Sequence, residues 1–238
     1  MKIIGLTGGI GMGKSTAARF FRAARIPVFD ADATVHALQS RGGRAIAPIG
    51  AAFPGTVHDK ALDRAALRTA VLGQPDALKQ LERIVHPLVR DEERRFIQRA
   101  RRAGKSAAVM DIPLLLEIDG IRRIDLVMAV SAPRAVQIHR VAQRRRMDRA
   151  QVAAVIARQM PDREKRRRAD WVIRTGLSRF SATRQLRRLL AALRAGGPPP
   201  RPHIGRIRAM RAIDNTIPGR AWLGRARYKK IRYNQSAQ

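Results

Sequence analysis

One short segment near the N-terminus restricts the folds open to this chain more than any other. Residues Gly8–Ser15 read GGIGMGKS and satisfy the spacing G-x-x-x-x-G-K-[ST]. The segment follows the apolar run Lys2–Leu6, which predicts a buried strand, and it precedes a helical pattern. In this strand–loop–helix setting, glycines let backbone amides wrap around phosphates, and the positive end of the helix faces them. The segment therefore predicts a nucleotide-phosphate site in an α/β protein.

The residues at the end of this loop suit separate tasks on a nucleoside triphosphate. Lys14 can bridge the β- and γ-phosphates, Ser15 can offer its hydroxyl to Mg²⁺, and Thr16 can reach the α-phosphate. We therefore expect ATP as co-substrate and Mg²⁺ as cofactor. The predicted ATP-binding residues of this segment are Gly9, Ile10, Gly11, Met12, Gly13, Lys14, Ser15 and Thr16.

Apolar segments that alternate with helical patterns predict the rest of the fold. Five strands are expected near residues 2–6, 26–29, 107–112, 124–130 and 171–173, which favours a five-stranded, mostly parallel sheet in a three-layer α/β domain over residues 1–195. The stretch of about 34–104 is too long for a simple crossover, so it predicts an inserted helical subdomain that binds the acceptor. The arginine-rich stretch of about 133–169 predicts a helical lid, and Ser178–Arg194 predicts a last core helix.

The formal net charge of +31 is the most unusual bulk property, and 41 of the 49 basic residues are arginine. A field of this size attracts polyanions, but codon composition acting on solvated helix faces explains the same skew. The Pro/Arg-rich segment 196–238 is predicted to be disordered or accessory, with nucleic acid or an anionic membrane as candidate partners. The absence of cysteine fits the cytoplasm, and neither a targeting segment nor a transmembrane run is recognised.

Three aspartates follow predicted strands and are candidates for the chemistry. Asp32 lies where a carboxylate can orient an acceptor hydroxyl and take its proton, and Asp30 is the better candidate for a helix cap. Asp111 ends the third strand and can hold hydrated Mg²⁺, or it can simply cap the strand end. A cap remains an alternative for Asp32 as well.

Several further motifs, taken in order, make the chain resemble the dephospho-CoA kinase family over about residues 1–193. The Pro-Leu-Leu-x-Glu and His-Pro elements discriminate best, because other small P-loop kinases lack that combination. The matching segments are Leu6–Thr16, Asp30–Asp32, Leu62–Arg64 with Leu67, His86–Leu88, Ile112–Glu117, Arg140, Arg144, Gln159–Pro161 and Ala169–Ile173.

This resemblance implies a P-loop kinase fold and transfer of phosphate from MgATP to the ribose 3′-hydroxyl of dephospho-CoA, the last step of coenzyme A synthesis. It implies that Asp32 is the catalytic carboxylate and that Lys14 serves the transfer. It also implies lid contacts to ATP from Arg140 and Arg144. The residues implied near the acceptor are His86, Leu114 and Glu117, although a His before Pro can equally terminate or pack a helix.

Three positions depart from the family pattern. His36 stands where an arginine is common, Arg145 where an acidic residue is common, and Thr175 lies in the turn that usually contains asparagine. The last departure puts an adenine-side contact in doubt. The rival interpretations are a nucleoside or nucleotide kinase and, from another class, a basic RNA-binding P-loop ATPase. The low aromatic content argues against base-stacking platforms.

Overall fold

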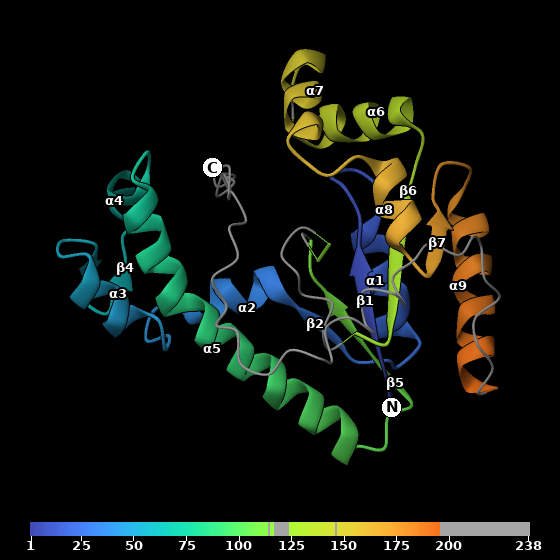
Figure 1. Cartoon of the computed structure of the whole chain (residues 1–238), viewed down its shortest axis with the longest axis horizontal. Coiled ribbons are helices and arrows are strands. Elements are labelled where there is room, and N and C mark those ends of the chain that lie inside the picture. The colour runs from blue at the N-terminus through green and yellow to red at the C-terminus, as the bar shows by residue number, and fades with distance from the viewer. Residues whose placement is uncertain (114, 117–123, 146, 196–238) are drawn as a thin grey trace, which may run out of the picture. The chain divides into compact units, whose positions relative to one another are not determined.

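The computed structural model describes residues 1–113, 115–116, 124–145 and 147–195 (Figure 1). A five-stranded parallel sheet runs in the order β2 (Val28–Asp30), β5 (Ala107–Asp111), β1 (Lys2–Thr7), β6 (Leu126–Ser131) and β7 (Trp171–Arg174). This confirms the predicted α/β class, and the strand ends differ from the predicted ones by at most two residues. The chain divides into two compact units, one of Arg25–Ile112 with Met1 and one of Lys2–Ala24 with the chain from Pro113 onward.

The unit that contains the glycine-rich loop is built on β1, β6 and β7. These strands pair in parallel, with Ile4 opposite Leu126 and Met128 opposite Trp171. β6 is buried along its whole length, as a strand covered on both faces should be. Helix α1 (Lys14–Ala23) packs on β1, and α9 (Arg179–Arg194) packs on both β7 and α1. As predicted, α9 ends at Arg194, and it buries Leu186, Leu189 and Leu190 in the core.

The basic segment predicted as a lid forms three helices between β6 and β7. They are α6 (Arg134–Arg145), α7 (Arg149–Ala157) and α8 (Asp162–Arg168). Helix α7 contacts α6 and begins with a capping box in which Asp148 and Gln151 exchange hydrogen bonds. Helix α8 packs on β6, where the Ser131 hydroxyl donates to Asp162 Oδ2 at 2.8 Å. Both ends of the segment are thus anchored at β6, and its closure over a ligand stays a prediction.

The other unit joins β2 and β5 to four helices. These are α2 (Ala31–Leu38), α3 (Ile46–Ala52), α4 (Arg64–Val71) and α5 (Pro75–Arg102). The first three pack against α5, around a core that includes Leu38, Ile49, Leu67, Leu81 and Val85. The 28-residue α5 continues through Pro87, so the His-Pro element does not end a helix.

Besides its helices, the insert contains one element that the sequence did not predict. Strands β3 (Val57–His58) and β4 (Ala61–Leu62) form a short antiparallel hairpin. Its two turn residues, Asp59 and Lys60, both have positive φ, at 48° and 59°. Such turns usually carry Asn-Gly or Asp-Gly, and Asp-Lys lacks the glycine that marks them in a sequence. Over the described residues, no helix combines the length and apolarity needed to cross a membrane.

Candidate active site

The glycine-rich loop adopts a backbone conformation that its glycines alone permit easily. Gly11 and Gly13 have φ angles of 73° and 92°, in a region that L side chains rarely adopt. Gly13 is also the residue that caps the N-terminus of α1, and no side chain occupies the cap. The first turn of α1, with Lys14, Ser15 and Thr16, therefore presents the positive end of the helix, as an anion site requires.

Other segments of the same unit fix the loop at Met12. The Met12 side chain is buried, and its carbonyl accepts a hydrogen bond from the Thr175 hydroxyl at 2.7 Å. The Ala132 amide, just after β6, lies 3.0 Å from the Met12 sulfur. The loop is thus attached to the ends of both β6 and β7. An added Cβ on Gly13 would lie 3.2 Å from the Thr175 hydroxyl, so this close approach favours glycine as well.

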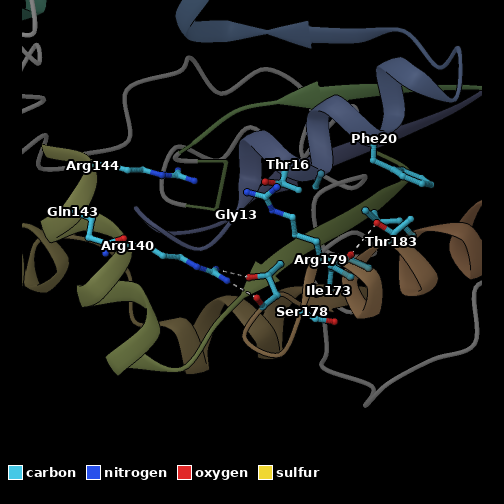
Figure 2. A pocket seen from close by; sticks show the side chains of 14 residues that line it. Gly13, Thr16, Phe20, Arg140, Gln143, Arg144, Ile173, Ser178, Arg179 and Thr183 are labelled. Atoms are coloured by element: carbon cyan, nitrogen blue, oxygen red, sulfur yellow. Dashed lines mark hydrogen bonds between the residues drawn. The ribbon is translucent and has the colours of Figure 1, made fainter.

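A pocket of about 340 Å³ opens beside the loop (Figure 2). That volume lies within the usual range for small-molecule sites. None of the described residues that line it is acidic, and three are arginines. The end of the loop, helices α1, α6 and α9, strand β7 and the residues after it supply its walls: Gly13, Thr16, Ala17, Phe20, Arg140, Gln143, Arg144, Ile173, Thr175, Ser178, Arg179, Ala182, Thr183 and Leu186. The pocket therefore suits an anionic ligand with an apolar or aromatic part.

The two predicted lid arginines both line this pocket but are held differently. Arg140 donates to the Thr175 carbonyl at 2.7 Å, to the Thr175 hydroxyl at 3.2 Å and to the Gly11 carbonyl at 3.5 Å. Its guanidinium thus joins α6 to the loop and to the turn after β7. Arg144, one turn further along α6, is exposed. The structure brings both arginines to the loop, and their contacts with ATP stay a prediction.

Thr175 explains how the chain accommodates its departure from the family pattern at this turn. The side chain is buried, and its hydroxyl lies between the carbonyls of Met12 and Ser131 and the Arg140 guanidinium. The hydroxyl is therefore engaged with protein groups that shape the loop.

In the other unit, the candidate carboxylates lie at the ends of β2 and β5. Asp30 and Asp111 are register partners, and Asp111 is 4% exposed. The Asp30 carboxylate accepts a hydrogen bond from the Ala33 amide at 3.0 Å, which confirms it as the N-cap of α2. Asp32 is exposed in the first turn of the same helix. Because Asp30 already caps α2, capping does not explain Asp32.

The remaining acceptor candidates are only partly described. His86 lies in α5, half-buried, near the core residue Val85. Burial lowers the pKa of His86, and the nearby charge of Arg90 lowers this pKa further, which favours the neutral imidazole near pH 7. Leu114 and Glu117, also predicted near the acceptor, lie outside the described residues. So does the side chain of Arg145, while His36 is exposed in the last turn of α2.

Sequence reasoning missed part of the pocket and part of the loop's support. Phe20 could have been found, because it lies one helical turn after Thr16 and shares its face of α1. Arg179 and Thr183 were treated only as parts of a core helix, although both line the pocket. Gln137 carried no sequence signal, and Gln159 had appeared only within a family motif.

A glycine-rich loop between a buried strand and a helix, a parallel sheet and a basic helical segment beside the loop together define a P-loop kinase. Among such kinases, the chain belongs to the dephospho-CoA kinase family, whose sequence profile matches residues 2–178.

Curated relatives support this assignment. The dephospho-CoA kinase of Gluconobacter oxydans is 55% identical over 198 residues, which cover 82% of this chain and 98% of the relative. That of Paramagnetospirillum magneticum is 58% identical over 166 residues, which cover 70% of this chain and 78% of the relative. A crystal structure of a Thermus thermophilus protein is similar, with a TM-score of 0.68, 37% identity and coverage of 81% of this chain and 97% of that one.

Proposed function

We propose that the chain transfers the γ-phosphate of ATP to the 3′-hydroxyl of the ribose in dephospho-CoA. The observation that carries this proposal is the 55% identity to a relative named dephospho-CoA kinase, almost all of whose length is matched. The pocket beside the glycine-rich loop supports it, because its arginines and apolar wall suit the phosphates and base of a nucleotide. The cytoplasm is the proposed compartment. Segment 196–238, with its predicted polyanion contacts, lies outside the described residues.

In the proposed reaction, Asp32 accepts the proton of the ribose hydroxyl while the hydroxyl oxygen attacks the γ-phosphorus. A new phosphorus–oxygen bond forms, the bond between the γ-phosphorus and the β–γ bridging oxygen breaks, and ADP leaves. Asp32 suits this task because it is exposed at the start of α2 and is not needed as the cap.

On the nucleotide side, the amides of the loop and of the first turn of α1 hold the phosphates, and Lys14 bridges the β- and γ-phosphates. Arg140 and Arg144 supply further positive charge from the pocket wall, where their delocalised cations suit phosphate oxygens. His86, Leu114 and Glu117 are proposed to contact the acceptor, with His86 as a neutral hydrogen-bonding group.

Mg²⁺ fits the oxygen donors that this proposal assigns to it. The Ser15 hydroxyl is exposed at the start of α1, and the carboxylate of Asp111 ends β5. Both are hard oxygen ligands of the kind Mg²⁺ takes together with water and substrate phosphates. When bound, Mg²⁺ neutralises charge that develops on the transferring phosphate.

A coupled assay of ADP release tests the proposal. We expect turnover with dephospho-CoA as acceptor and at least 100-fold lower kcat/KM with each member of a panel of nucleosides and nucleoside monophosphates. A Lys14→Ala variant is the control for contaminating kinases and should abolish the signal. If dephospho-CoA gives no turnover while a nucleoside does, the acceptor assignment is wrong.

A further inference from the structure

Two glutamines hold the main chain on both sides of Ile10 in the middle of the phosphate loop. The Ile10 amide donates to Gln159 Oε1 at 2.9 Å. The Ile10 carbonyl accepts from Gln137 Nε2 at 2.7 Å. The two bonds fix the peptide groups before and after one residue, and therefore the orientation of the chain through it. We call this pair of contacts the Ile10 bracket.

Both glutamines come from the base of the basic helical segment: Gln137 lies where the chain leaves β6, and Gln159 lies before α8, which packs on β6. Gln137 is in the first turn of α6, is 3% exposed, and its amide donates to the Pro133 carbonyl. Gln159 lies between α7 and α8, just before Asp162, which binds the Ser131 hydroxyl at the end of β6. The bracket therefore joins the phosphate loop to the first helix of the predicted lid and to the turn before its last helix.

The glycines around Ile10 fit this interpretation independently of the hydrogen bonds. A Cβ on Gly9 would lie 3.0 Å from Gln159 Oε1 and 3.3 Å from Gln137 Nε2. A Cβ on Gly11 would lie 2.7 Å from a methyl carbon of Val141 and 2.9 Å from the Gln137 carbonyl. Side chains at either position would push α6 and Gln159 away. These glycines thus serve the approach of the lid base as well as that of a phosphate.

We propose that Gln137 and Gln159 are positioning residues that hold the loop in its phosphate-binding shape and couple that shape to the base of the lid. A loop that is free in the absence of nucleotide must be ordered on binding, and fixing each of its backbone residues costs conformational entropy. The bracket meets part of that cost in advance. Its loss should therefore weaken nucleotide binding without affecting the acceptor. The inference rests on the proposed function only where the KM for dephospho-CoA is measured.

The test replaces each glutamine by methionine, which keeps the length of the side chain and removes its hydrogen bonds. Gln98→Met, at an exposed position of α5, is the matched control. ADP affinity is measured by calorimetry without acceptor, followed by kcat, the KM for ATP and the KM for dephospho-CoA. These are measured well below the melting temperature, which is recorded for every variant.

We expect Gln137→Met and Gln159→Met each to weaken ADP binding and raise the KM for ATP by about 5- to 10-fold, the value of one hydrogen bond. The KM for dephospho-CoA should stay within twofold, and Gln98→Met should match the wild type. The double variant should lose less than the product of the single losses, because both contacts hold one residue.

Wild-type ADP affinity in Gln159→Met overturns the proposal, whatever the melting temperature does. Equal increases in both KM values also overturn it, since they indicate general loosening. Gln159 is only partly buried, so this variant remains informative even if the change at buried Gln137 prevents folding. ADP affinity is independent of the acceptor, so failure of the acceptor assignment and failure of the bracket give different results.

Discussion

The phosphate loop and the acceptor candidates hold their polar groups in opposite ways. In the loop, main-chain groups of Ile10 and Met12 are held by the side chains of Gln137, Gln159 and Thr175. In the other unit, the candidates are single side chains on helices, such as exposed Asp32 and half-buried His86. A site made of backbone depends on the shape of several segments, whereas a site made of one side chain depends on its chemistry. Substitutions should therefore act differently in the two regions.

The largest effect is expected from Asp32→Asn, which replaces the proposed proton acceptor by an amide of the same size. We expect kcat to fall by about 100-fold or more. ADP affinity should be unchanged, because Asp32 lies in α2 and does not belong to the phosphate loop. Steady-state kinetics and calorimetry check both parts.

The matched control for this change is Asp30→Asn, two residues earlier. Asparagine can still accept the bond from the Ala33 amide, so the cap should persist and kcat should remain within a few-fold of wild type. Near-normal turnover of Asp32→Asn would reject Asp32 as the base and remove the contrast between the two regions.

A smaller effect on turnover, with a clear effect on stability, is expected from Gly11→Ala. Gly42→Ala is the control, since both glycines have φ of 73° but a Cβ on Gly42 would meet no atom within 4 Å. In both variants the alanine must adopt a left-handed backbone conformation, which costs about 1–2 kcal/mol. Only in Gly11→Ala does the new Cβ also collide with α6. We expect it to melt several degrees below the control and to bind ADP about tenfold more weakly. Equal melting temperatures and affinities would show that the loop tolerates displacement.

The smallest effect concerns the pH dependence of stability through His86. Folding lowers the pKa of His86 below its unfolded value of 6.5. The contribution of the neutral imidazole to the free energy of unfolding is therefore fully present above pH 6.5, and it is lost as the pH falls through the folded pKa. His86→Gln lacks this loss. Between pH 7.5 and 5, its melting temperature should therefore gain about 1–2 °C relative to wild type. A melting-temperature profile of His86→Gln that stays parallel to that of the wild type from pH 7.5 to 5 would contradict the assignment of this effect to His86.

Much of the fold was predictable because local patterns carry it. The apolar runs of β1, β5, β6 and β7 are bounded by turns, and the periodic leucines of α9 end before Gly196. The hairpin at Asp59 and Lys60 escaped prediction because both residues have positive φ and neither is the glycine that usually marks such a turn in a sequence. The continuation of α5 through Pro87 escaped for a related reason, since packing of a long helix outweighs one lost backbone bond.

By itself, the sequence determined the phosphate loop and its chemistry, because glycines, Lys14 and Ser15 lie next to one another along the chain and their roles follow from backbone geometry. It also assigned Asp30 to the cap, which the structure confirms. Only the tertiary structure revealed what holds the loop. Gln137, Gln159 and Thr175 lie more than 120 residues from it, and a neutral amide or hydroxyl has no sequence signature until folding places it against a particular carbonyl or amide. Hydrogen bonds of this kind are directional and short-ranged, so three-dimensional proximity decides them.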